Sequence, residues 1–208
     1  VKNRAQVFGY YDHNMLVMSE RITEHLPKSD KFTPKQRLWY IRAKEVVISS
    51  GSIERPLVFG NNDTPGVMLS SAAKEYMKVY GVLVGKKPII FTNNDSAYET
   101  AIEFKKNGIN PVILDSRKDF SSDLINEAKN LGIVIKFEYV VVNANGYRKV
   151  KSADVAKISE DKTELEKIEN IQCDCICVSG FWTPTIHLAS QSGGKTKFNE
   201  EIDAFVPS

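Results

Sequence analysis

Two hydrophobic patterns divide the chain. Near the amino end apolar and polar residues alternate, and a period of two is typical of strands with one buried face. We therefore expect a β-hairpin over residues 4–22 and a third antiparallel strand at residues 37–42. Unbroken apolar runs instead predict strands that are buried on both faces. Such runs occur at residues 46–48, 88–91, 112–114 and 175–178.

Helical spacing separates the buried runs in the middle of the chain. The pattern predicts helices over residues 68–80, 95–106 and 121–130, each followed closely by a glycine. Strand, helix, strand, helix, strand over residues 88–136 is half of a Rossmann-type parallel sheet. The remaining expectations are strands within 133–142 and 147–158, a turn at 143–146 and a short charged helix at 162–170.

The spacing of the cysteines argues against chemistry at sulfur. Cys173, Cys175 and Cys177 alternate along the chain, which places all three on one face of a strand. Metal sites and redox pairs usually leave two or more residues between cysteines, so that the chain can turn back on the metal or sulfur. We therefore favour buried core thiols over a metal or disulfide role, and we expect a reducing compartment, the cytoplasm.

Composition and charge narrow the class of protein. With 208 residues, 42% hydrophobic and 26% charged, the chain suits a globular protein of one large or two small domains. A net charge of +2, with Lys in excess of Arg, gives no case for a nucleic-acid partner. The apolar runs are far shorter than the roughly 20 residues of a membrane helix. The chain lacks an initiator Met and begins inside a strand, so we expect part of a longer polypeptide.

Small residues end two of the buried runs, and we expect a ligand at both places. Gly51 ends the first run after two serines, and Gly180 ends the last run after one. A glycine at the carboxyl end of a buried strand lets bare backbone approach another group, which in an open α/β sheet is usually a ligand. Arg55, in the turn after the first run, suits either a phosphate or an ion pair with a neighbouring acid.

The loop after the strand at 88–91 lacks the glycines of a phosphate-binding loop. It reads TNNDSA, from Thr92 to Ala97, where a dinucleotide fingerprint has G-x-G-x-x-G or G-x-G-x-x-A. Asn94 puts a side chain where backbone touches pyrophosphate, and Asp95 adds a repelling charge. Asp115 stands where a ribose-binding acid belongs. Two interpretations stay open, a dinucleotide bound in an altered way and a scaffold that has lost its ligand; we favour the second.

Several segments, in order, resemble the alpha subunits of heterotetrameric sarcosine oxidases. The most specific are TNNDSAY at residues 92–98 and SGFWTPTIHLASQSGG at residues 179–194, because no general dinucleotide fold requires them. Segments 7–27 and 37–85 follow the family as well. Phe181 departs from the family pattern, since it stands where we expect a second glycine.

The resemblance implies an α/β fold of the Rossmann-like FAD/NAD(P)-binding type. It is the glutathione-reductase-like arrangement of two dinucleotide domains with a β-meander, truncated at the amino end. Residues 1–66 plus 180–208 would form part of the first domain. Residues 82–178 would form the inserted second domain.

The resemblance also implies a function within a larger complex. Such complexes oxidise sarcosine with O2 and, with tetrahydrofolate, yield glycine, H2O2 and methylenetetrahydrofolate. The alpha chain would carry a non-catalytic NAD, while FAD and FMN would belong to a partner subunit and tetrahydrofolate to a separate domain. The implied partners are beta, gamma and delta subunits. We expect this stretch to hold at most one wall of the NAD site and to be inactive alone.

The strand ends and the resemblance together select the candidate contacts of NAD. We expect no catalytic or metal-binding residue; Trp182 suits packing better than stacking, and His187 suits a core histidine better than a base. Competing hypotheses are a disulfide-reductase-like flavoprotein, the alpha chain of an amine or opine oxidase, and a structural module with empty sites. The candidate contacts are Ser50, Gly51, Ser52, Arg55, Gly180, Phe181, Trp182 and Thr183.

Overall fold

The computed structural model describes residues 1–161 and 163–208. These residues divide into two compact units, of which one combines residues 1–53 with 183–208 and the other runs from 54 to 182. Within the described residues, no helix is both long and apolar enough to cross a membrane.

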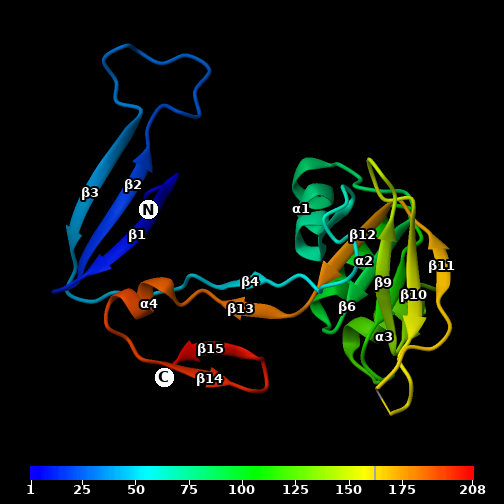
Figure 1. The fold of residues 1–208 in the computed structure, drawn as a ribbon. Coiled ribbons are helices and arrows are strands. Elements are labelled where there is room, and N and C mark those ends of the chain that lie inside the picture. Colours follow the sequence, from blue (N-terminus) through cyan, green and yellow to red (C-terminus); the bar gives the residue numbers. More distant parts are fainter. Residues whose placement is uncertain (162) are drawn as a thin grey trace. The chain divides into compact units, whose positions relative to one another are not determined.

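A five-stranded parallel sheet forms the centre of the unit 54–182 (Figure 1). The strands lie in the order β5-β12-β6-β7-β8. Because they are parallel, each connection between consecutive strands must cross over one face of the sheet. Every residue of β6 and β12 is buried, which confirms the prediction from their unbroken apolar runs. The strands are β5 (Val67–Leu69), β6 (Pro88–Thr92), β7 (Val112–Asp115), β8 (Val134–Phe137) and β12 (Cys175–Ser179).

Three helices cover one face of this sheet, and all three predicted helices are confirmed, except that residues 68–69, predicted to begin the first helix, belong to β5. They are α1 (Ser70–Tyr80), α2 (Ser96–Lys106) and α3 (Asp123–Asn130). The hydroxyl of Ser122 caps α3 by accepting a hydrogen bond from the N–H of Ile125. The helices and the sheet enclose a core that includes Met77, Ile90, Tyr98, Phe104, Ile113 and Ile125.

An antiparallel sheet covers the other face. It consists of β9 (Tyr139–Asn145), β10 (Ser152–Lys157) and β11 (Glu169–Gln172). The turn predicted at 143–146 is wrong for its first three residues, which extend β9 because they pair with β10. Of the helix predicted at 162–170, residue 162 lies outside the described residues; residues 163–168 form no helix and 169–170 begin β11. Beneath this sheet lie Phe91, Leu114, Val141, Val155, Ile176 and Val178.

The three cysteines are free and buried, as predicted, but they do not share one face. The sulfur atoms of Cys175 and Cys177 lie 3.6 Å apart in the core beneath the helices. Cys173 precedes β12 and packs into the opposite core, because strand alternation begins only after it. Burial raises the pKa of the Cys173 thiol to about 12, so the thiolate is absent at neutral pH.

The unit of residues 1–53 and 183–208 contains the predicted β-meander. Strands β1 (Ala5–Tyr11), β2 (Met15–Arg21) and β3 (Gln36–Arg42) pair antiparallel in this order, with a bulge between Val7 and Gly9. The carboxyl-terminal part adds α4 (His187–Gln191) and the hairpin of β14 (Thr196–Asn199) and β15 (Ala204–Pro207). Strands β4 (Ser52–Glu54) and β13 (Trp182–Pro184) form a two-stranded sheet.

The buried strand predicted at residues 46–48 is wrong. These residues form no strand, and Val47 and Ile48 are exposed. They line an apolar hollow of about 260 Å³ together with Val7, Leu16 and Leu188. An apolar run can cover one face of a sheet without pairing as a strand, and hydrophobicity alone does not distinguish the two.

We expect the three thiols to be protected in the folded chain. Cys173, Cys175 and Cys177 are all buried, so a reagent in solution cannot reach them. Burial also raises the pKa of Cys173, which disfavours its reactive thiolate. Ellman's reagent should therefore label none of them until guanidinium unfolds the chain, and then all three. Rapid labelling of any thiol under native conditions would contradict the burial described here.

Candidate functional site

The carboxyl edge of the parallel sheet is the place where open α/β sheets bind ligands. Strands β12, β6 and β7 end there at Ser179, Thr92 and Asp115, and all three residues are buried. The strand register places Ser179 beside Thr92 and Thr92 beside Asp115. The edge therefore brings together the two segments that the sequence singled out, the TNNDSA loop and the end of β12.

The side chain of Asn94 bridges this edge. Its amide nitrogen donates to the carbonyl of Ser179 at 3.2 Å and to the Ser179 hydroxyl at 3.0 Å. Its amide oxygen accepts from the backbone N–H of Ser96 at 3.1 Å and from the Ser96 hydroxyl at 2.6 Å. The first N–H groups of a helix are the donors that a phosphate would use. At the start of α2, the side chain of Asn94 accepts from one of these donors, the N–H of Ser96.

The carboxylate of Asp115 is fully paired within the protein. Arg117 donates from Nε to Oδ1 at 2.9 Å and from Nη2 to Oδ2 at 2.7 Å. The backbone N–H of Arg117 also donates to Oδ1, and the hydroxyl of Tyr98 donates to Oδ2 at 2.8 Å. Asp115 is 0% exposed. A ribose hydroxyl would have to displace these partners.

Arg117 also neutralises the acid of the TNNDSA loop. Its Nη2 lies 2.9 Å from Oδ1 of Asp95, so one guanidinium serves two carboxylates. The guanidinium packs over the ring of Phe120, with its carbon 4.4 Å from the ring centre. Arg117 thus reduces the repulsion that Asp95 would exert on a phosphate. Its guanidinium is already paired with Asp95 and Asp115, however, and would have to leave them to bind the phosphate itself.

Glu54 accepts a hydrogen bond at the start of α1, as Asn94 does at the start of α2. Its Oε2 accepts from the backbone N–H of Ser71 at 2.8 Å, and the residue is 4% exposed. A carboxylate at this position is stabilised by the positive end of the helix dipole. The helix therefore begins without a capping side chain of its own at Leu69.

The candidate residues Arg55, Gly180 and Phe181 come together through their backbones. The N–H of Gly180 donates to the carbonyl of Arg55 at 2.6 Å, and the N–H of Arg55 donates to the carbonyl of Phe181 at 2.9 Å. A Cβ on Gly180 would lie 2.9 Å from the carbonyl oxygen of Pro56. The close approach that this glycine permits is therefore made by the chain itself.

Phe181 and Trp182 follow in the same segment. Phe181 has a φ of 81°, in the left-handed region that favours glycine, at the position where the sequence pattern led us to expect glycine. The indole N–H of Trp182 donates to the hydroxyl of Ser96 at 2.8 Å. Trp182 thereby attaches the end of β12 to the start of α2.

The other candidates lie in the unit of residues 1–53 and 183–208. The hydroxyl of Ser50 donates to the carbonyl of Thr185 at 2.7 Å, and the N–H of Thr185 donates to the carbonyl of Gly51 at 2.9 Å. Gly51 has a φ of 66°, and a Cβ added to it would meet nothing within 4 Å. Ser52 is exposed, whereas Thr183 is half-buried. Residues 50–52 are therefore exposed, although the Ser50 hydroxyl and the Gly51 carbonyl already have partners at Thr185.

The core position expected for His187 is wrong. His187 is exposed at the start of α4, and His13 lies at positive φ in the turn between β1 and β2. Among the described residues, no group of three or more His, Cys, Asp or Glu side chains is arranged to hold a metal. The sequence did not reveal that Glu54, Asn94 and Arg117 form hydrogen bonds within the site. For Arg117 the one sequence signal was a basic residue two positions after Asp115.

Replacing Arg117 should destabilise the fold strongly. Arg117→Ala leaves the buried carboxylate of Asp115 without its cation, and breaking such a pair costs about 3 kcal/mol or more of unfolding free energy. Chemical denaturation measures this loss. Arg148→Ala is the matched control, because Arg148 is exposed and should change stability by less than about 0.5 kcal/mol. Equal effects of the two substitutions would refute the pairing.

The tyrosine in this network predicts a dependence on alkaline pH. Burial, with the nearby charge of Asp115, raises the pKa of Tyr98 well above its ordinary value. The neutral hydroxyl therefore stabilises the fold below about pH 10, and this contribution is lost at higher pH, where the unfolded chain ionises first. The unfolding free energy of the wild type should fall more steeply between about pH 9 and 11 than that of Tyr98→Phe. Parallel pH profiles would count against this explanation.

Comparisons with known proteins relate the chain to one family. No protein-family model matches it. Sarcosine oxidase subunit alpha of Corynebacterium sp. strain P-1 is 37% identical over 207 residues, which is 98% of this chain and 21% of the relative. The subunit alpha of Rhizobium meliloti strain 1021 is 35% identical over 204 residues, 98% of this chain and 20% of the relative. The chain thus spans about a fifth of the length of these relatives.

Solved structures agree on the fold. L-proline dehydrogenase from P. horikoshii has a TM-score of 0.59 at 21% identity, covering 98% of this chain and 32% of that one. Thioredoxin reductase from T. acidophilum has a TM-score of 0.66 at 15% identity, covering 93% and 57%. The fold is the Rossmann-like FAD/NAD(P)-binding fold of such oxidoreductases, as the sequence predicted. Over nearly its whole length, the chain is a homologue of one segment of sarcosine oxidase subunit alpha, and it belongs to that family through this segment.

Proposed function

We propose that the chain is a scaffold and nucleotide-binding region of the alpha subunit of a sarcosine oxidase-like oxidoreductase. The observation that carries this proposal is the identity of 35–37% to subunits of that name over almost the entire chain. The fold supports it, because the structural neighbours are oxidoreductases. The name of the relatives supports membership in a complex of several subunits.

The reaction proposed for the complete complex is the oxidation of sarcosine. Sarcosine, O2 and tetrahydrofolate would give glycine, H2O2 and methylenetetrahydrofolate. FAD and FMN would lie on a partner subunit, tetrahydrofolate on another domain, and beta, gamma and delta subunits would complete the assembly. The residues of this chain would perform none of these steps, because its polar groups at the sheet edge pair with one another.

NAD would be held against the residues that have room for it. We propose that backbone and hydroxyls of Ser50, Gly51 and Ser52 form one wall of its site, and that Arg55 pairs with a phosphate. The open space around Gly51 fits this assignment, since a ligand can approach the backbone there. Gly180, Phe181, Trp182 and Thr183 would contribute through the segment that follows β12. The groups at Asn94 and Asp115 do not fit NAD, because they are engaged within the chain.

A second candidate function is a structural module that binds no nucleotide. The self-paired sheet edge favours it for the unit 54–182, where Asn94, Arg117 and Glu54 fill positions that ligands use in related folds. The alpha chain of an amine or opine oxidase is a variant of the first proposal with another substrate. The first proposal also includes two dinucleotide domains. Residues 1–66 and 180–208 would form part of one, and residues 82–178 would form the other.

Calorimetry on the complete alpha chain tests the NAD assignment. Arg55→Gln should weaken NAD binding about tenfold, since a hydrogen bond to a charged group contributes roughly 1.5 kcal/mol or more. Arg148→Gln, an exposed arginine outside the proposed wall, should leave the affinity unchanged. Sarcosine-dependent formation of H2O2 by the complex is the parallel readout, and it should persist in both variants.

The outcomes separate the candidates. A wild-type chain that binds no NAD would favour the structural module. A complex that forms H2O2 from another amine and none from sarcosine would favour the related amine or opine oxidase. Unaltered NAD affinity in Arg55→Gln would remove Arg55 from the proposed site.

A further inference from the structure

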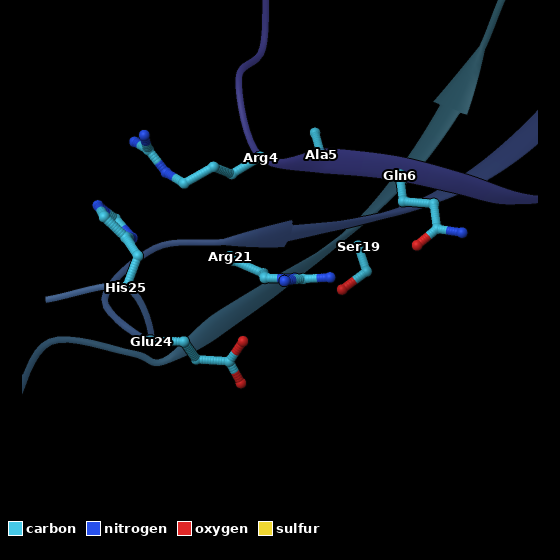
Figure 2. Close-up of a pocket in the computed structure, with 7 residues that line it drawn as sticks. All are labelled: Arg4, Ala5, Gln6, Ser19, Arg21, Glu24 and His25. Carbon is cyan, nitrogen blue, oxygen red and sulfur yellow. The ribbon is translucent and has the colours of Figure 1, made fainter. Parts of the chain in front are cut away.

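A hollow on the β-meander carries a concentration of hydrogen-bond donors that the proposed function does not use. It has a volume of about 400 Å³ and is formed by β1, β2 and the loop after β2 (Figure 2). This volume lies within the range of pockets that hold small ligands. The polar side chains that line it are Arg4, Gln6, Ser19, Arg21, Glu24 and His25.

The strand register explains why these side chains share one face. Gln6 of β1 lies directly opposite Ser19 of β2. The backbone N–H of Arg21 donates to the carbonyl of Arg4 at 2.9 Å, so the backbones of the two arginines lie beside each other just beyond the last register pair of Ala5 and Glu20. Ser19 and Arg21 are two apart on β2 and therefore point to the same side, and Arg4 lines the same hollow from the turn before β1.

Arg4 and Arg21 bring two positive charges to the lining of the hollow. Within the described residues, neither guanidinium has an ion pair or a side-chain hydrogen bond. The acid nearest in the lining, Glu24, has one carboxylate oxygen engaged by the amide of Gln36 at 2.6 Å. The lining therefore keeps a net positive charge.

The backbone at the hollow is also strained. Arg4 has a φ of 55°, in the left-handed region that favours glycine. Figure 2 shows the side chains of Arg4 and His25 extending toward the same side of the view, and that of Arg21 extending toward Ser19. Guanidinium, imidazole, amide and hydroxyl groups are all able to donate to one acceptor-rich ligand.

We propose that this hollow binds the phosphate group of a small molecule, with Arg4 and Arg21 as the principal donors. A phosphate has only acceptor oxygens and up to two negative charges, which matches two unpaired guanidinium groups. Gln6, Ser19 and His25 would complete the hydrogen bonds. The site is independent of the proposed NAD wall at residues 50–52.

Titration calorimetry of the complete chain with inorganic phosphate, in a buffer without other oxyanions, tests the proposal. Arg4→Gln and Arg21→Gln should each weaken binding about tenfold or more, because each removes a charge-assisted pair. Arg42→Gln is the matched control, since Arg42 lies on β3 outside the hollow. Adenosine monophosphate as a second probe tells whether the phosphate belongs to a nucleotide, in which case it should compete and bind more tightly.

Circular dichroism and thermal unfolding confirm that the variants are folded, as expected for exposed residues. No binding of phosphate by the wild type at millimolar concentration would overturn the proposal. An equal loss in Arg42→Gln would overturn it as well, because it would reveal attraction by surface charge alone.

Discussion

The buried carboxylate of Asp115 is the constraint on which the edge of the parallel sheet depends. A carboxylate without solvent must have a cation and a full set of hydrogen bonds, or it would be too costly to keep ionised. Arg117 and Tyr98 meet this need, and their positions then fix the end of β7 relative to α2. Because Arg117 also reaches Asp95, the same pairing holds the loop between β6 and α2 in place.

The same edge illustrates how a dinucleotide fold can become a scaffold. In open α/β sheets the strand ends and helix starts offer unpaired donors to a ligand. Here Asn94 accepts from the start of α2 and Glu54 from the start of α1, while Asp115 is saturated. Internal pairing of this kind stabilises the unit without a ligand. It leaves the accessible backbone near Gly51, in the other unit, as the better candidate for a nucleotide contact.

Local patterns in the sequence predicted most of the parallel unit, because its strands are unbroken apolar runs and its helices have clear starts and stops. The run at residues 46–48 misled for the same reason, since hydrophobicity does not say whether a neighbouring strand exists to pair with it. Cys173 was misplaced because the alternation of β12 begins after it. The sequence showed that Asn94 stands where a phosphate-binding loop has glycine. Its hydrogen bond to Ser179 was not predictable, because the two residues are 85 positions apart and only the fold brings them together.

The chain's own side chains close the edge at residues 92–97 and 115–117. Hydrogen–deuterium exchange of the complete protein, with and without saturating NAD, tests it most directly. We predict that exchange in peptides covering these residues is unchanged by NAD, whereas peptides around residues 50–52 become protected. Protection of the 92–97 and 115–117 peptides would contradict the account, because a dinucleotide would then occupy the edge.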